Sequence, residues 1–362
     1  MEEEIEESKL KKQRNMYIFD AVLIVIIFAA LLFYIFKEDG IENIQNILRM
    51  VDYRWVVGGI GCLIGMWVCE AITLQVSLKT MYPKQKIGNS FKITMIGQLF
   101  NNITPFASGG QVMQAYVMSK EGKRASDTAS ALVVKYVITQ ALLIVFTILV
   151  VISQFEFFAS IFKDLIWIGI IGIILNVGVV ICFFLAGAKK ELVMKVCRPL
   201  IRFGGKIHIG KFRLVKDPDM RILKLTASVN NFSEQFYKMK NHKKTLFIMA
   251  VFGLLQNVFY YAITYMVYKA FGNVGTSFLQ VVTAQAFLML IMTVFPTPGA
   301  GGGAEGGFLL LFGEIFTSGI NMAILFWRVY VFYLPIIVGI CFLIPALKKI
   351  SKIEKSKRIE NK

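Results

Sequence analysis

Long uninterrupted runs of apolar residues dominate the chain and predict helices that cross a membrane. A helix needs about 20 such residues to span the hydrocarbon core of a bilayer. Six segments meet this requirement, at about 17–36, 55–78, 134–152, 165–185, 246–271 and 323–347. Between the first two, isoleucine and leucine recur at helical spacing over 41–51, which predicts a short helix lying on the membrane surface.

Two further apolar stretches, at about 88–118 and 278–316, are broken near their middle by proline and glycine. The breaks read ThrProPheAlaSerGlyGlyGln at 104–111 and ThrProGlyAlaGlyGlyGlyAla at 297–304, and they agree at five of eight positions. The shift between them is 193 residues, close to half of the chain, which predicts an internal repeat. Because three full spans lie between the breaks, the second hairpin should enter the membrane from the side opposite to the first.

These patterns predict an all-α polytopic membrane protein with about six full transmembrane helices plus two re-entrant broken-helix hairpins in an inverted repeat. Irregular backbone is tolerated at membrane depth only where protein buries it or where it lines a wet cavity. We therefore expect the two breaks to face each other across a central cavity. The predicted order is a tail (1–16), a first membrane repeat (17–185) with its break near 104–111, a basic amphipathic segment (186–245), a second membrane repeat (246–347) with its break near 297–305, and a basic tail (348–362).

Composition and charge placement support a membrane protein. Hydrophobic residues make up 56% of the chain and charged residues 17%, against about 25% charge in typical soluble domains. Lys and Arg number four in 1–16, seven in 79–133, fifteen in 186–245 and seven after 347, with none in 272–322. The positive-inside rule then places both termini in the cytoplasm, so the net charge of +17 does not indicate a nucleic-acid partner. For segment 186–245, attraction to anionic lipid, an orientation signal alone and nucleic-acid binding remain three interpretations.

Ionisable residues inside the apolar runs are candidates for function, because placing one there costs about 2.5–3.5 kcal/mol. Glu70, Glu305 and Arg328 are the deepest, and we expect Arg328 to pair with Glu305 or with Glu70. Arg328 would hold a phosphate while a carboxylate meets an amine or a proton; the alternative is an ion pair that only locks helix packing. Lys135 and Asp20 lie near the ends of their spans and are expected to reach the interface.

Backbone and amide groups near the breaks are further candidates. Each break starts a half-helix whose first N–H groups attract anions such as phosphate, although a packed helix kink is the alternative. Amide side chains before and after the breaks are expected to line the cavity or to form interhelical hydrogen bonds: Gln98, Asn101, Asn102, Gln111 and Gln285. Two histidines and five scattered cysteines indicate neither a metal site nor a disulfide framework, and we expect no cofactor. Nucleotide-binding loops and hydrolase motifs are absent from the sequence.

Three motifs resemble the lysylphosphatidylglycerol synthase transmembrane-region family. They are GlyGlnLeuPheAsnAsnIleThrProPheAlaSerGlyGlyGln at 97–111, ProThrProGlyAlaGlyGlyGlyAlaGlu at 296–305 and TrpArgValTyr at 327–330. The family's members are bacterial and archaeal membrane proteins similar to the flippase half of the multiple-peptide-resistance factor. The resemblance covers nearly the whole chain. It implies a lipid-translocating fold of a bacterial plasma membrane, with re-entrant helices around a central cavity and lipid headgroups as substrate.

The resemblance and the residue chemistry together define a predicted lipid-binding set. By position in the motifs, the resemblance implies roles for Pro105, Gly109, Gly110, Pro298, Gly303, Glu305 and Arg328. Where the family often has an acid after the first GlyGly pair, this chain has Gln111. The complete predicted set is Glu70, Gln98, Pro105, Gly109, Gly110, Gln111, Pro298, Gly302, Gly303, Glu305 and Arg328.

The function that follows is a flippase or transporter that moves a phospholipid, either aminoacylated phosphatidylglycerol or another phosphate-bearing lipid, between leaflets. The enzymatic alternative is a phosphatidylglycerol lysyltransferase. Full-length members that make lysylphosphatidylglycerol carry a large soluble domain after the spans, whereas only about fifteen residues follow the last span here, which argues against that activity. A scaffold for lipid-modifying enzymes is a third hypothesis. The expected partners are membrane phospholipids, with a second copy of the chain or a lipid-modifying enzyme as further ones.

Overall fold

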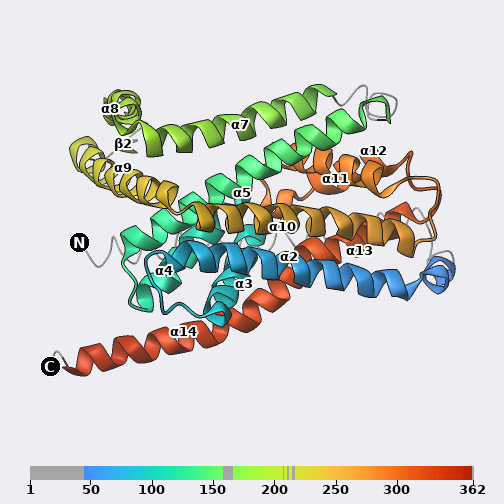
Figure 1. The fold of residues 1–362 in the computed structure, drawn as a ribbon, viewed down its shortest axis with the longest axis horizontal. Coiled ribbons are helices and arrows are strands. Elements are labelled where there is room, and N and C mark those ends of the chain that lie inside the picture. Colours follow the sequence, from blue (N-terminus) through green and yellow to red (C-terminus); the bar gives the residue numbers. More distant parts are fainter. Residues whose placement is uncertain (1–44, 158–165, 207, 210–211, 214–216, 361–362) are drawn as a thin grey trace.

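The computed structural model describes residues 45–157, 166–206, 208–209, 212–213 and 217–360 (Figure 1). The predicted first span at 17–36 and Asp20 lie outside these residues. The described chain is almost entirely helical. A single pair of two-residue strands, β1 (His208–Ile209) and β2 (Phe212–Arg213), interrupts it.

The twelve longer helices of the described chain confirm the predicted all-α polytopic fold. They are α2 (Tyr53–Lys79), α3 (Ile87–Ile103), α4 (Gly109–Lys120), α5 (Ala125–Ser153), α7 (Ile166–Ala188), α8 (Lys190–Lys206), α9 (Pro218–Asn241), α10 (Lys243–Ala270), α11 (Phe278–Met292), α12 (Gly303–Phe312), α13 (Ile320–Arg328) and α14 (Leu334–Glu360). Among the described residues, α2, α5, α10 and the continuous Ile320–Lys352 segment are long and apolar enough to cross a membrane. Helix α7, of 23 residues, covers the predicted span at 165–185.

Helices α2 and α10 form the centre of the molecule. They lie side by side and run in opposite directions (Figure 1). Their close approach depends on glycine in α2, because a Cβ atom on Gly65 would lie 3.0 Å from the ring of Phe259, and one on Gly58 would lie 3.2 Å from the sulfur of Met266. No hydrophobic effect drives helices together within a lipid bilayer. Small residues at such contacts let the two backbones approach closely, so that van der Waals packing can hold the helices together.

Two helical hairpins pack against this central pair. The first consists of α3, the short helix η1 (Pro105–Ala107) and α4; the second consists of α11, η3 (Pro298–Ala300) and α12. The first hairpin lies toward the end of the molecule that carries α9 and the C-terminal end of α14, and the second lies toward the opposite end (Figure 1). The two turns, η1 and η3, are in contact. The breaks therefore face each other, as the sequence predicts.

The internal repeat extends from sequence to backbone conformation. Phe106 has φ 54° and ψ 22°, and Gly299, 193 positions later, has φ 58° and ψ 22°. The next pair matches too, with φ 50° at Ala107 and φ 52° at Ala300. Left-handed φ values cost a non-glycine residue about 1–2 kcal/mol. Their occurrence at equivalent positions therefore reflects a turn that the rest of the repeat imposes.

The same shift of 193 residues relates whole helices. When the chain is aligned with itself at this shift, the start of α4 falls near the start of α12, and the start of α5 falls near the start of α13. The shift also pairs α2 with α10, which run in opposite directions, so the two sets of helices are inverted relative to each other. Helix α7 has no counterpart at this shift among the described residues. The predicted boundaries of the two membrane repeats stay predictions.

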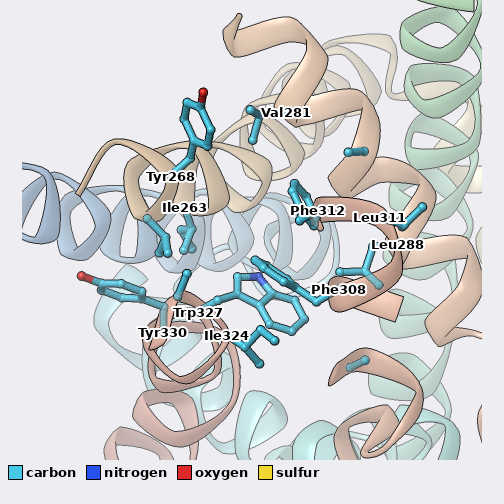
Figure 2. Close-up of a cluster of buried hydrophobic side chains, with 14 of the residues drawn as sticks. Ile263, Tyr268, Val281, Leu288, Phe308, Leu311, Phe312, Ile324, Trp327 and Tyr330 are labelled. Atoms are coloured by element: carbon cyan, nitrogen blue, oxygen red, sulfur yellow. The ribbon is translucent and has the colours of Figure 1, made fainter. Parts of the chain in front are cut away.

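An aromatic cluster fixes the second hairpin against α10 and α13. Figure 2 shows the fully buried Trp327 beside Phe308 and Phe312 of α12. The Trp327 and Phe308 ring centroids are 5.1 Å apart, and those of Phe308 and Phe312, one helical turn apart, are 4.4 Å apart. Aromatic packing of this kind contributes beyond the apolar area that it buries. It holds α12 and Arg328, which follows Trp327 directly, in a fixed relation.

Candidate functional site: the cavity between the two breaks

The first break starts helix α4 with neutral side chains that cap its N–H groups. Gly109 N donates to Thr104 Oγ1 at 2.8 Å, and Gly110 N donates to Asn101 Oδ1 at 3.1 Å. This geometry requires glycine, because a Cβ atom on Gly110 would lie 2.1 Å from Asn101 Oδ1 and 2.6 Å from Gly97 O. From the sequence, the first N–H groups of this half-helix are expected to attract a phosphate. At Gly109 and Gly110 these N–H groups instead donate to side chains of the protein.

The second break starts helix α12 with a charged side chain. Gly302 N donates to Glu305 Oε2 at 2.7 Å, and the other oxygen of the same carboxylate, Oε1, accepts from Arg328 Nε at 2.7 Å. Arg328 Nη1 also donates to Gly299 O at 2.9 Å. The predicted pair of Glu305 with Arg328 is confirmed. The anion expected at a helix N-terminus is here supplied by the chain itself.

Local structure holds the Arg328 guanidinium from several sides. It lies 5.3 Å from the ring centroid of Trp327 and 5.4 Å from that of Phe332. A π-helical turn, η4 (Val329–Tyr333), follows directly. Pro335 explains this turn, because it lacks the N–H that would bond to the carbonyl of Val331 in an α-helix. Such π-turns are frequent at functional sites.

A cavity of about 560 Å³ lies between the two breaks. Phe106 and Ala107 line it from the first break, and Thr297, Gly299 and Ala300 line it from the second. The polar part of its wall consists mostly of amides and hydroxyls, contributed by Gln98, Asn101, Asn102, Tyr136, Asn176, Gln256, Asn257, Tyr260, Tyr261 and Thr293. Arg328 is the cation among the lining residues.

Several polar atoms of this wall lack a hydrogen-bond partner within the described chain. They include Arg328 Nη2, Gln256 Oε1 and Asn257 Nδ2. The Arg328 side chain is 97% buried, since its exposed fraction is 3%. Leaving such a group unpaired costs about 1–3 kcal/mol or more when it is charged. Arg328 itself donates through Nε and Nη1, so Nη2 is the guanidinium nitrogen that has no hydrogen-bond partner among the described residues.

A second buried ion pair, between Lys135 and Glu70, lies behind the cavity wall. The prediction that Lys135 reaches the membrane interface is wrong. Lys135 does not reach the interface: it is buried and donates to Glu70 Oε1 at 2.7 Å, while the Gln98 amide donates to Glu70 Oε2. Helix α5 begins at Ala125, nine residues before the predicted span. Lys135 therefore lies about 15 Å along the helix, too deep for its side chain to leave the protein. Of the two carboxylates considered for Arg328, Glu70 is bonded to Lys135 instead.

The predicted set divides into residues that line the cavity and residues that shape its turns. Gln98 and Arg328 line it, together with Asn101 and Asn102, whereas Glu305 and Glu70 touch lining residues from behind. The remaining predicted residues build or flank the breaks without lining the cavity: Pro105, Gly109, Gly110, Gln111, Pro298, Gly302 and Gly303. Gln285 does not line it either, because its carbonyl accepts from Thr264 Oγ1 at 2.7 Å in the fully buried interior.

Seven polar lining residues were missed from the sequence: Tyr136, Asn176, Gln256, Asn257, Tyr260, Tyr261 and Thr293. Asn176, Gln256, Asn257 and Tyr260 lie inside the apolar runs at 165–185 and 246–271. An amide within such a run was the available signal, since polar groups inside membrane helices face the protein interior or a wet cavity. Asn176 also donates to Thr293 Oγ1 at 3.2 Å, which joins α7 to the second hairpin.

Together, the helices and the cavity define a polytopic helical membrane protein with an internal cavity at the meeting point of two inverted hairpins. The chain matches the lysylphosphatidylglycerol synthase TM region family over residues 18–339, and it belongs to that family. The resemblance noted in the sequence is thereby confirmed, and the protein is a membrane protein of a lipid-related family. Among curated proteins no match is found.

Proposed function

We propose that the protein moves a phosphate-bearing lipid between the two leaflets of its membrane. The observation that carries the proposal is the buried Arg328, which lines a cavity between two broken helices and whose Nη2 has no hydrogen-bond partner among the described residues. Guanidinium groups bind phosphate through paired hydrogen bonds and cannot lose their charge. Inverted repeats with broken helices around a central site are a common design of transporters.

The cavity offers different chemistry to the two parts of a lipid. Its amide and hydroxyl groups suit a glycerol-phosphate headgroup, which presents donors and acceptors. Leu175 and Val179 of α7 line the same cavity and are 48% and 39% exposed on the molecule's surface. We infer that the headgroup enters beside α7 while the acyl chains stay in the bilayer.

Binding would exchange one anion for another at Arg328. The phosphate takes the place of Glu305 at the guanidinium, and the carboxylate becomes available to an amine. A headgroup that carries both groups, such as that of aminoacylated phosphatidylglycerol, would satisfy both residues, whereas phosphatidylglycerol would satisfy Arg328 alone. Rocking of one repeat against the other would then open the site to the opposite leaflet.

The proposal is tested by lipid exchange in proteoliposomes that contain fluorescent phosphatidylglycerol, with a membrane-impermeant quencher added outside. Wild-type protein should expose nearly all of the label, and Arg328→Gln should abolish exchange because the phosphate loses its charged donor. Lys348→Gln, which removes an exposed cation of α14 that does not line the cavity, is the matched control and should exchange at the wild-type rate. Equal exchange by Arg328→Gln and wild type would refute the role of Arg328.

The family description, which names a synthase, favours phosphatidylglycerol lysyltransferase as the second candidate function. Incubation of the purified protein with lysyl-tRNA and phosphatidylglycerol separates the two candidates. Formation of lysylphosphatidylglycerol without exchange would favour the enzyme over the transporter.

We further propose a bacterial plasma membrane, with the end that carries α8, α9 and the C-terminal end of α14 facing the cytoplasm. Support comes from the positive-inside rule, since this end collects the basic segment 189–244. In right-side-out vesicles of a cysteine-free variant, an impermeant thiol reagent should label Val274→Cys and spare Lys348→Cys. The reverse pattern would invert the assignment.

A further inference from the structure

Lys135 holds, in the first half of the molecule, the position that Arg328 holds in the second. The shift of 193 residues that relates Pro105 to Pro298 also relates Lys135 to Arg328. Leu132 and Leu325, one helical turn before the two cations, are identical. Both cations are buried, with exposed fractions of 8% and 3%.

The acids that neutralise these cations are not related by the repeat. The counterpart of Glu70 is Ile263, which is fully buried, and the counterpart of Glu305 is Val112, which is exposed. Each cation is thus paired with a carboxylate from a different type of element: α2 for Lys135 and the start of α12 for Arg328. What the two halves share is a buried cation at the equivalent position of the repeat. A cation that both halves keep indicates a ligand that both halves bind. The two carboxylates need only neutralise the cations while that ligand is absent.

We propose that Lys135 is a second phosphate-binding residue, which receives the lipid headgroup when the cavity is open to the other side of the membrane. This inference rests on the proposed function. It names the residue that binds the phosphate when the cavity is open to the opposite leaflet. Phosphate would displace Glu70 from Lys135, as it displaces Glu305 from Arg328. Lysine serves here as a point charge, which is sufficient for a phosphate.

The present geometry places Lys135 one residue layer from the cavity. Tyr136, its neighbour in the chain, lines the cavity, and so does Gln98, which donates to Glu70. Met66, one helical turn before Glu70 in α2, lines it too. In the state described here Arg328 faces the cavity while Lys135 is closed off. If the two repeats exchange conformations, as inverted repeats do, this difference reverses.

The simpler explanation is an ion pair that only joins α2 to α5. The paired substitution Glu70→Gln/Lys135→Gln separates the two explanations. It removes both charges together and keeps groups that can hydrogen-bond, so it avoids the uncompensated buried charge that makes removal of one partner alone strongly destabilising. If the pair only joins the two helices, the variant should fold and exchange lipid. If Lys135 binds phosphate, the variant should fold but should not exchange lipid.

The first measurement is lipid exchange in proteoliposomes, alongside the melting temperature in detergent. We expect the paired variant to melt near the wild-type temperature while its exchange rate falls roughly tenfold or more, the effect of losing one charge-assisted hydrogen bond. Lys92→Gln/Glu121→Gln is the matched control, because it removes an ion pair that lies away from the cavity and should leave exchange unchanged. Lys135→Arg should retain measurable exchange. Wild-type exchange by the paired variant would overturn the inference.

The second measurement does not need transport. Dihexanoyl phosphatidylglycerol, a water-soluble short-chain lipid, is added to detergent-solubilised protein and the rise in melting temperature is recorded. Arg328→Gln and the paired variant should each reduce the rise, and the triple variant should abolish it. A wild-type rise in the paired variant overturns the inference. A rise that depends on Lys135 in a protein that shows no exchange would refute the proposed function and leave Lys135 as a phosphate-binding residue.

Discussion

The two breaks have the same backbone turn but different chemistry at the helix that follows. At the first break, the start of α4 is capped by neutral Thr104 and Asn101, and its cation, Lys135, is closed off by Glu70. At the second, the start of α12 is capped by Glu305, which is itself bound to Arg328 at the cavity wall. The repeat thus preserves the turn and the buried cation, whereas the anion that neutralises each cation comes from a position that the repeat does not share.

The largest expected effect distinguishes the two ion pairs. Glu70→Ala leaves the Lys135 ammonium without its hydrogen-bonded carboxylate and should destabilise the protein by about 3–5 kcal/mol. Glu305→Ala should cost less, because Arg328 keeps its bond to Gly299 O and its two aromatic neighbours. The measurement is chemical or thermal unfolding in detergent, with the exposed Glu314→Ala as control. Equal stability of Glu70→Ala and wild type would show that the pair is not buried.

A smaller effect is expected from the glycines that start the half-helices. Gly110→Ala forces a Cβ atom against Asn101 and the carbonyl of Gly97, which should cost about 1–3 kcal/mol. Gly306→Ala, in α12 with open space around it, should instead stabilise the helix by up to about 1 kcal/mol. The two melting temperatures should move in opposite directions. A shift of the same sign in both would contradict the packing described for the first break.

The smallest effect concerns the left-handed turn itself. Phe106 is largely exposed at φ 54°, so Phe106→Gly should relieve about 1 kcal/mol of backbone strain with little loss of packing. The equivalent Gly299→Ala should destabilise, since its Cβ atom would lie 2.2 Å from the Phe332 ring. Melting temperatures of the two variants provide the test. Destabilisation by Phe106→Gly would mean that its ring packs more tightly than its exposure indicates.

Much of the fold could be predicted because its signals are local. Apolar length predicted helices α2, α5, α7, α10 and the Ile320–Lys352 segment, and the repeated Pro and Gly predicted the breaks and their contact. The depth of Lys135 was hidden because helix α5 begins with polar residues such as Thr128 and Ser130, which are buried against neighbouring helices. Judged by hydropathy alone, such polar residues resemble those of a loop. The span predicted at 134–152 therefore began too late. For Gln285 the sequence left two alternatives open, because it does not show which way a side chain points; the structure shows the interhelical hydrogen bond, with Thr264 of α10.

The central claim is that the two breaks enclose a binding site for a lipid phosphate at Arg328. A structure of the protein in phosphatidylglycerol nanodiscs, determined by electron cryomicroscopy, tests this most directly. We predict density for a phosphate between η1 and η3, within hydrogen-bond distance of Arg328 Nη2, in the cavity of about 560 Å³. Lipid density confined to the outer surface, with Arg328 bound to Glu305 in every class and only water between the breaks, would contradict it.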